Sequence, residues 1–400
     1  LPLSGSGQQK ESESVKSTLE GPIVNPEGKK PSSPNFLMPI SGIITLRMKR
    51  KVNIAVIGAG WWSTDHHMPS LKSYDKVDFC AIAELKPQKM SKAANHFEID
   101  GAYQDYNEMI STEKLDGVII AVQHSYHYQI ARDALEAGLH VFVEKPMTLE
   151  SKQAWDLVQL ADSRKLHLMV GYTYHFSGHA QIARRLVQSG EIGEIDFISI
   201  LYTSWVEEYL RGNPQKYSDA FEFRLTAPEI DSYSDPINSG GGQGFLQVVH
   251  PLGMLFWVTE LRGDEVFAFM NNSDLKVDLI DSFSFRLNNG AIGTIGSHGG
   301  ATPEQTLDQT LIYYGSKGFI RQDIIHGKLS MHLKNGVVKD FPDLKPDEVY
   351  KSFLPARSFV DLIAGEGENK CPGWVGARAI EFLEAGYKSA YSNQSEKIIL

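Results

Sequence analysis

The tripeptide Glu144-Lys145-Pro146 places a carboxylate and a cation directly after an apolar run, residues 138–143. Such a run is typical of a short buried parallel strand. Ligands of open α/β sheets bind at the carboxyl ends of the strands. Lys145 is therefore expected at the mouth of a nucleotide site, where it can hydrogen-bond a substrate hydroxyl and favour its deprotonation. A solvated loop lysine is the alternative.

A second group of residues is suited to the phosphates of a dinucleotide. The strand-like run 52–57 leads into Gly58-Ala-Gly60-Trp61-Trp62-Ser63, and a helix-like stretch follows. Glycines let the backbone approach a pyrophosphate, and a helix N-terminus favours its negative charge. Ser63 stands where the fingerprint has its third glycine, so an isolated turn is the alternative. We expect Gly58, Gly60, Trp61 and Trp62 to contact a nicotinamide coenzyme.

Glu84 ends the second strand-like run, residues 77–83. An acid at this place accepts hydrogen bonds from the ribose hydroxyls and repels a 2′-phosphate. Glu84 therefore favours NAD over NADP, although Lys86 nearby weakens that preference. A surface glutamate at a strand end is the alternative.

His250 follows a Gly240-Gly-Gly242 segment and lies on an apolar helix-like stretch, residues 244–259. An imidazole that faces the nicotinamide could receive the hydroxyl proton. A packed core histidine is the other interpretation. The pairs His124/His127 and His175/His179 have helical spacing for a metal, but neither has an obvious carboxylate partner, so we expect no metal site.

The elements that must position these residues alternate along the first part of the chain. Strand-like runs at 52–57, 77–83, 117–122, 140–143 and 166–171 are separated by helix-like stretches, which predicts an α/β Rossmann domain over residues 49–172. Residues 173–400 are predicted to form an α+β domain with a largely antiparallel sheet. Residues 1–48 are rich in Ser, Gly, Pro, Glu and Lys and predict a disordered extension.

Bulk composition narrows the class of protein. The chain has 400 residues and a formal net charge of −10, which disfavours nucleic acid as the main partner. No run is long and apolar enough to span a membrane. Cys80 and Cys371 show no metal or redox spacing, and so few cysteines fit a reducing compartment, so we expect a cytoplasmic protein.

Taken together, these residues resemble the glucose–fructose oxidoreductase / inositol dehydrogenase / MocA (Gfo/Idh/MocA) family. The setting A-L-E-A-G-L-H-V-F-V-E-K-P-M-T-L and the order of glycine-rich turn, E-K-P and G-G-G…His carry the likeness. The resemblance implies a Rossmann domain, a C-terminal open sheet that makes a dimer or a dimer of dimers, and oxidation or reduction of a sugar or polyol with NAD(P). It places Gly58, Gly60, Glu84, Glu144, Lys145 and His250 at functional positions, and His127 beside them.

The chain departs from the family pattern at three places. Gln123-His124 replaces Pro-Asn, His175 replaces an Arg, and Leu246 replaces the usual Asp one turn before the histidine. That acid often binds substrate hydroxyls. We expect its polar contacts to pass to substrate-binding residues among Tyr174, His175, Gln243 and Gln247.

Three functions remain open at this point. The first is an NAD-dependent oxidoreductase with Lys145 and His250 as catalytic residues. The second is an NAD-dependent glycosidase or lyase that holds NAD tightly and oxidises its sugar transiently, which the loss of the Asp at Leu246 favours. The third is a non-catalytic nucleotide-sensing protein.

Overall fold

The computed structural model describes residues 50–221 and 223–398, and the extension predicted over residues 1–48 lies outside them. A six-stranded sheet is formed by β1 (Val52–Ile57), β2 (Val77–Ala83), β3 (Gly101–Tyr103), β4 (Gly117–Ile120), β5 (His140–Val143) and β6 (Leu168–Val170). The order is β3-β2-β1-β4-β5-β6, and every pairing is parallel. This is the doubly wound order of dinucleotide-binding folds, as the sequence predicts.

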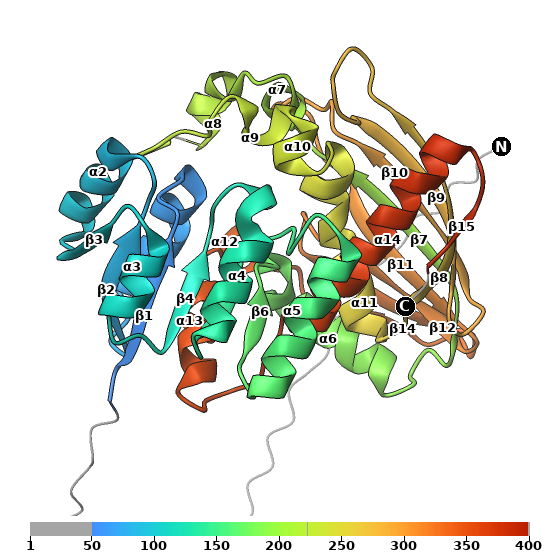
Figure 1. Ribbon diagram of the computed structural model, residues 1–400. Helices are drawn as coiled ribbons and strands as arrows, with labels where there is room; N and C mark the ends of the chain where they lie inside the picture. Colours follow the sequence, from blue (N-terminus) through green and yellow to red (C-terminus); the bar gives the residue numbers. More distant parts are fainter. Residues whose placement is uncertain (1–49, 222, 399–400) are drawn as a thin grey trace, which may run out of the picture. The chain divides into compact units, whose positions relative to one another are not determined.

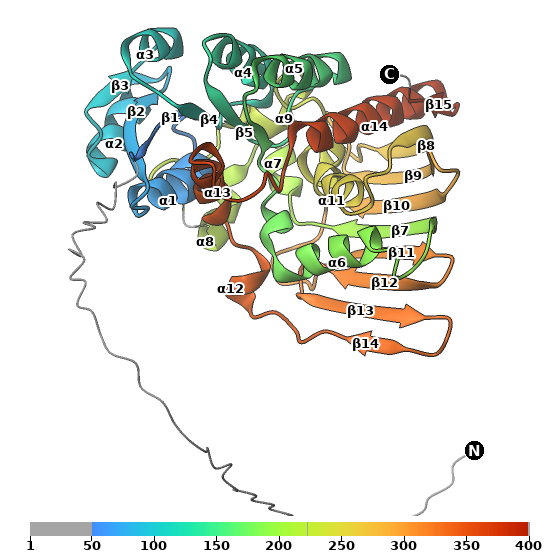
Figure 2. The ribbon, with the colours of Figure 1, turned by 90° about the horizontal axis from the view of Figure 1, so that it is seen from below.

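Helices cover both faces of this sheet (Figure 2). One face carries α3 (Tyr106–Thr112), α4 (His127–Glu136) and α5 (Ser151–Arg164), and the other carries α1 (Met68–Lys72), α2 (Pro87–Phe97) and α13 (Leu354–Ile363). Strands buried on both sides are apolar along most of their length; β4 is buried throughout, and β5 is buried and apolar after its half-buried His140. Helix α13 falls in the range predicted as the second domain, yet its Phe359 packs on Phe142 of β5, with ring centroids 5.9 Å apart.

A nine-stranded sheet follows, in the order β14-β13-β12-β11-β7-β10-β9-β8-β15. Its strands are β7 (Ile195–Thr203), β8 (Gly263–Asn271), β9 (Ile280–Leu287), β10 (Ile292–His298), β11 (Gln309–Gly315), β12 (Gly318–Asp323), β13 (Lys328–Leu333), β14 (Val338–Asp340) and β15 (Glu396–Lys397). The β7–β10 pair is parallel and the other pairs are antiparallel. The prediction of a mostly antiparallel second sheet is confirmed.

Three helices cover one face of the second sheet: α6 (Gly178–Gln188), α11 (Val249–Thr259) and α14 (Gly373–Ser392) (Figures 1 and 2). Side chains of β9 alternate between exposed and buried along the strand, which is the period expected when one face is covered and the other is not. Among the described residues no helix covers the opposite face. No helix in this part of the chain has the length and apolar character needed to cross a bilayer.

Short helices and single helical turns connect the longer elements along the chain. They are η1 (Ser63–His67), η2 (His124–Tyr126), η3 (Thr173–Phe176), α7 (Glu207–Leu210), η4 (Pro214–Tyr217), α8 (Ser218–Phe221), α9 (Asp231–Ser234), α10 (Pro236–Ser239), η5 (Gly244–Val248) and α12 (Pro346–Val349). Both η1 and η5 are single π-helical turns that lead into α1 and α11. Such turns occur frequently at functional sites.

Candidate functional site

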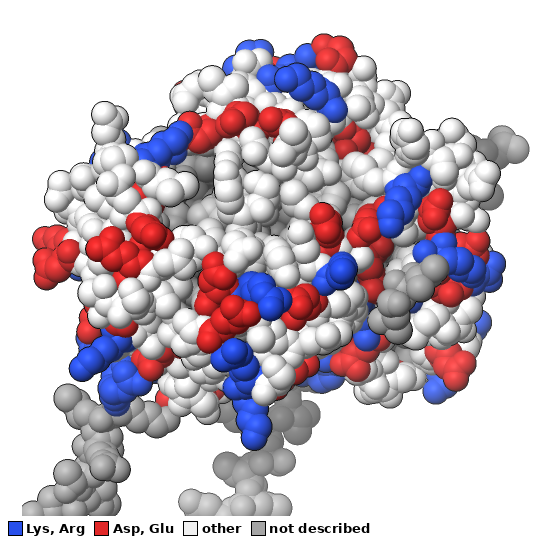
Figure 3. Space-filling view, viewed as in Figure 1, with Lys and Arg blue, Asp and Glu red and all other residues white. Residues whose placement is uncertain are grey.

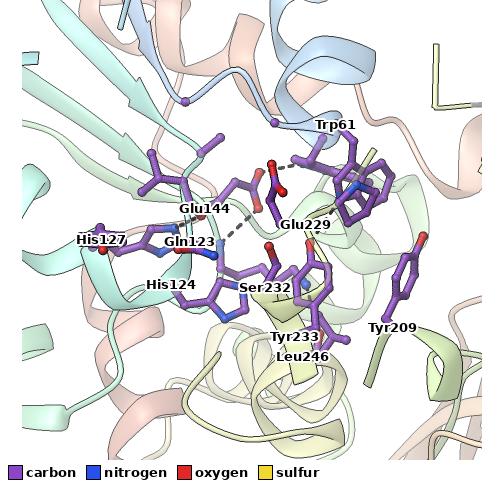
Figure 4. A pocket seen from close by; sticks show the side chains of 18 of the residues that line it. Trp61, Gln123, His124, His127, Glu144, Tyr209, Glu229, Ser232, Tyr233 and Leu246 are labelled. Carbon is purple, nitrogen blue, oxygen red and sulfur yellow. Dashed lines mark hydrogen bonds between the residues drawn. The ribbon is translucent and has the colours of Figure 1, made fainter. Parts of the chain in front are cut away.

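A cavity of about 850 Å³ lies at the carboxyl ends of β1, β2, β4 and β5. Its wall also includes residues of η5 and α11 and of the segment 202–233. Figure 3 shows the surface hollowed between these two parts of the molecule, and Figure 4 shows side chains from both converging. A cavity therefore occurs where the parallel sheet predicts a ligand site.

The glycine-rich turn forms one end of this cavity. Gly58 has a φ of 99°, and a Cβ at this position would lie 2.3 Å from the carbonyl oxygen of Ala121, so only glycine fits. Around Gly60 the nearest atom to such a Cβ is 3.9 Å away. The backbone of the turn is thus open to a ligand at Gly60, as the pyrophosphate of a dinucleotide requires.

Glu84 lies beside this turn and is held by two backbone amides. Its Oε2 accepts a hydrogen bond from the Ala59 amide at 2.9 Å, and its Oε1 accepts one from the Lys86 amide at 3.0 Å. The carboxylate therefore stands at the end of β2, where Rossmann folds bind the ribose hydroxyls. The turn, the acid and the cavity together fit a dinucleotide.

Two tryptophans extend the wall from the turn toward the rest of the site. Trp62 Nε1 donates to Glu144 Oε1 at 3.0 Å, and Trp61 Nε1 donates to the Tyr233 hydroxyl at 3.3 Å. Both indoles line the cavity. Each links the glycine-rich turn to an element far along the chain.

Glu144 is a buried carboxylate with several partners. Its Oε1 also bonds His67 Nε2 at 2.8 Å, and its Oε2 accepts from the Lys145 amide at 3.1 Å. Burial by itself raises the pKa of Glu144, but the hydrogen bond with His67 and the charges of His67 and Lys145 lower it below its ordinary value. Glu144 is therefore an anion that holds the turn carrying Lys145.

Lys145 follows β5 and lies in the cavity wall. Its Nζ donates a hydrogen bond to the backbone oxygen of Leu246 at 3.0 Å, and its bond to Pro146 is cis. Burial lowers the pKa of Lys145 to about 8, while the charge of Glu144 opposes this change. The Lys145 amine is therefore mostly protonated at pH 7, but it loses its proton at a pH much closer to neutral than an exposed lysine does.

The segment before His250 is held by Asp278. Asp278 Oδ1 accepts from the Gly242 amide and Oδ2 from the Gly244 amide, both at 2.7 Å, and the Tyr387 hydroxyl donates to Oδ1 at 2.6 Å. A Cβ at Gly242 would lie 1.9 Å from the Asp278 backbone oxygen. Gly242 therefore permits close packing against Asp278, and Gly241 packs against Tyr387, so these contacts set the start of the helix that carries His250.

His250 lines the same cavity as Lys145. Its Nδ1 is buried and has no hydrogen-bond partner within the described part of the chain. Burial, and then the positive charges of Lys145 and His175, hold the pKa of His250 well below its ordinary value. His250 is therefore a neutral imidazole, the form that can accept a proton.

His124 and His127 also line the cavity, and their rings lie 5.6 Å apart. His127 has Nδ1 at 2.8 Å from the Pro146 oxygen and Nε2 at 3.1 Å from the Val122 oxygen. His124 Nδ1 lies 3.1 Å from the Ser239 oxygen. These ring nitrogens are thus hydrogen-bonded to backbone carbonyl groups. His127 links the turn after β5 to the segment that follows β4.

The four predicted substrate-binding residues divide into two pairs. Tyr174 and Gln247 line the cavity, and Tyr174 donates to Gln309 Oε1 at 3.1 Å. His175 does not line it, because its ring is stacked on Trp257, with centroids 4.5 Å apart.

Gln243 does not line the cavity either. Its amide is buried and bonded to the hydroxyls of Ser204 and Ser297, at 2.9 and 2.8 Å. His175 and Gln243, which the sequence predicts as substrate-binding, therefore lie behind the wall of this cavity, where both pack against other side chains.

An aromatic cluster from the segment 203–233, whose individual residues no sequence motif singles out, lines the cavity. Trp205, Tyr209, Phe221 and Tyr233 all line it, and Leu246 packs in the same cluster. The Tyr209 hydroxyl is buried and has no hydrogen-bond partner among the described residues. The density of aromatic residues between positions 202 and 233 is the signal that would have indicated this wall.

Comparisons with known proteins agree with this geometry. The family model "Oxidoreductase family, NAD-binding Rossmann fold" matches residues 52–172, and "GFO/IDH/MocA C-terminal domain" matches residues 180–321. The inositol 2-dehydrogenase/D-chiro-inositol 3-dehydrogenase of Lactiplantibacillus plantarum is 28% identical over 35% of this chain and 41% of its own length. The D-xylose 1-dehydrogenase (NADP(+)) of Hypocrea jecorina is 30% identical over 63% of this chain and 66% of its own.

Solved structures share the fold. The WlbA dehydrogenase of Bordetella pertussis, in complex with NADH and UDP-GlcNAcA, has 19% identity and a TM-score of 0.67 over 88% of this chain and 100% of its own. The chain spans about two fifths of the length of the first curated relatives it matches. Because both halves match models of one family in the expected order, the chain belongs to the Gfo/Idh/MocA family.

Proposed function

We propose that this protein is an NAD-dependent oxidoreductase that moves a hydride between nicotinamide and a secondary hydroxyl or carbonyl carbon of a sugar or polyol. One observation carries the proposal: Lys145 and His250 line the same cavity as the turn at Gly58 and the carboxylate of Glu84. A pair of residues suited to proton transfer and a turn suited to a dinucleotide therefore line one cavity. The names of the relatives, an inositol and a xylose dehydrogenase, support the class of substrate.

The residues of this chain have separate roles in that reaction. Bound NAD supplies the hydride acceptor. The Lys145 ammonium hydrogen-bonds the substrate hydroxyl and stabilises the negative charge that develops on its oxygen. His250, neutral because it is buried, accepts the hydroxyl proton. Glu144 holds the turn that carries Lys145 in place.

The coenzyme is proposed to be NAD rather than NADP. Glu84 places a carboxylate at the ribose end of the cavity, where it would accept hydrogen bonds from the ribose hydroxyls and repel a 2′-phosphate. A named relative uses NADP(+), so this preference is a property of the residues at the ribose end and not of the family.

The test measures turnover of a panel of polyols and aldoses with NAD⁺, and the absorbance of the NADH that forms gives the rate. Lys145→Met should lower kcat/KM by about 10²–10⁴-fold, the usual cost of one positioned proton-handling group. Exposed Lys152 on α5 provides a matched control, and Lys152→Met should retain wild-type rates. Near-full activity of Lys145→Met would overturn the assignment.

An NAD-dependent glycosidase or lyase is the second candidate, and one observation favours it. The segment that carries Thr226 and Tyr233 crosses to the glycine-rich turn, where the Thr226 hydroxyl donates to the Ala59 oxygen at 3.2 Å. Such a contact over the coenzyme end would slow coenzyme release. Product formed from glycosides with no net NADH would support this candidate over the first.

Two further properties belong to the proposal. We expect a homodimer or dimer of dimers formed through the uncovered face of the second sheet, where Leu201, Phe269 and Ile292 are exposed. We also expect a cytoplasmic location, since Cys80 and Cys371 are free thiols and show no disulfide partner in the described chain.

A further inference from the structure

Two lysines stand just beyond Glu84 at the ribose end of the cavity. Lys86 precedes α2 and Lys89 lies in its first turn, and both line the cavity. Cations at this place in a Rossmann fold accommodate the 2′-phosphate of NADP. Taken alone, the lysine pair would therefore counteract the discrimination that Glu84 provides.

A carboxylate from the other half of the chain occupies this lysine pair. Glu229 Oε1 lies 2.8 Å from Lys86 Nζ and also contacts Lys89 Nζ. The hydrogen bonds from Lys86 and Lys89 lower the pKa of Glu229, although partial burial opposes them. A single carboxylate oxygen of Glu229 thus forms ion pairs with both ammonium groups, as a phosphate oxygen could.

The segment that carries Glu229 is bonded to the first half of the chain at two adjacent residues just before Glu229. Lys92 Nζ of α2 donates to the Leu225 oxygen at 2.5 Å. The Thr226 hydroxyl bonds both the Ala59 oxygen and the Thr64 hydroxyl, at 3.2 and 3.3 Å. These contacts fix the position of Glu229 independently of its own ion pairs.

The picture of the surface agrees with this arrangement. Basic and acidic side chains adjoin where the segment 223–230 reaches α2 (Figure 3). Figure 4 shows Glu229 on the same side of the cavity as Ser232 and Tyr233. Glu229 therefore projects from the crossing segment into the space that a coenzyme would share.

We propose that Lys86 and Lys89 form a latent site for a 2′-phosphate, and that Glu229 occupies it and thereby makes the protein selective for NAD. This inference rests on the proposed function, because it concerns the choice of its coenzyme. Glu84 and Glu229 act together. Glu84 accepts hydrogen bonds from the ribose hydroxyls, and Glu229 neutralises Lys86 and Lys89, which would otherwise attract a phosphate. Glu229 is a specificity-determining residue and takes no part in the chemistry.

The rival explanation is that Glu229 only fastens the crossing segment. In that case its loss would change the binding of NAD and NADP by the same factor. Selectivity therefore separates the two explanations, because only an occupied phosphate site predicts an effect confined to the coenzyme that carries the 2′-phosphate.

The experiment is calorimetric titration of the full chain with NAD⁺ and, separately, with NADP⁺. Glu229→Gln keeps the shape of the side chain and should tighten NADP⁺ binding by about 10- to 100-fold, because two lysines gain a free phosphate partner. NAD⁺ binding should change by less than about threefold. Glu208→Gln, which breaks a Glu–Lys pair with Lys216 outside the cavity, is the matched control and should change neither.

A second variant tests the lysines directly. Lys89→Met should cancel the gain when it is combined with Glu229→Gln, and it should change NAD⁺ binding little in either background. Equal changes for both coenzymes, or no gain for NADP⁺, would overturn the inference while wild-type NAD⁺ binding leaves the proposed function standing. If the wild-type chain binds neither dinucleotide, the proposed function and the inference both fail.

Discussion

Replacing Lys145 should make the protein more stable at neutral pH, and this can be measured without knowing the substrate. Burial lowers the pKa of Lys145 from 10.5 to about 8. At about 1.4 kcal/mol per pKa unit this corresponds to at most about 3.5 kcal/mol of folding free energy. Water that enters the cavity beside the ammonium reduces the figure, so about 2 to 3 kcal/mol is expected.

The sign follows from which state binds the proton more tightly. The folded pKa of Lys145 lies below its unfolded value, so the unfolded chain holds this proton more strongly. The cost to the folded state is fully present below about pH 8 and disappears as the pH rises through about 10.5. The unfolding free energy of the wild-type chain should therefore rise relative to that of Lys145→Met as the pH increases from about 8 to about 10.5.

The assay is urea unfolding of both proteins at several pH values from 7 to 10.5. All other titrating groups are shared, so the difference between the two unfolding free energies isolates Lys145. Loss of the hydrogen bond to Leu246 adds an offset that does not depend on pH in the variant. Lys152→Met supplies the control and should run parallel to the wild type. If the unfolding free energies of Lys145→Met and the wild type differ by the same amount at every pH, the reasoning that burial lowers the pKa of Lys145 is refuted.

Three other outcomes are expected. His250→Asn should retain coenzyme binding but lower kcat by about 10²-fold or more; because burial holds the pKa of His250 well below its ordinary value, any acidic limb that this change removes should lie at a lower pH than an exposed imidazole would give, and an unchanged pH–rate profile would place the base elsewhere. Gly58→Ala should cost more than about 2 kcal/mol of unfolding free energy in urea, because the new Cβ would lie 2.3 Å from a backbone oxygen; wild-type stability would show that the turn relaxes freely. Ile292→Arg, on the uncovered face of the second sheet, should convert a dimer to a monomer in sedimentation analysis, and a wild-type chain that is monomeric at micromolar concentration would contradict the proposed interface.

Local patterns predict the first sheet well because its strands are buried on both faces. The runs at 52–57 and 77–83 coincide with β1 and β2, and Glu144 and Lys145 follow β5 as expected. Strand β3 was missed because Gly101–Tyr103 is short and only partly buried, so it has no apolar run to detect. Periodicity reports burial, and elements with little burial leave little signal.

Long-range contacts set the parts of the site that the sequence could not predict. Gly242 packs against Asp278 and Gly241 against Tyr387, more than 30 residues away, and no local pattern contains that information. The position of His175 in the sequence suggests a substrate contact, but in the fold its ring stacks on Trp257 of α11 and lies outside the cavity wall. Glu229 looks like an ordinary loop residue until the fold brings it to α2.

Lys145 is held at position 246 by the main chain and not by a side chain. A carbonyl oxygen is present whatever residue occupies that position, so exchange of Leu246 leaves the support of the ammonium unchanged. The side chain at 246 meanwhile lines the cavity and joins its aromatic wall. Under the proposed function, a substitution at position 246 would therefore change the shape of the substrate wall while the backbone contact that holds the Lys145 ammonium stays the same.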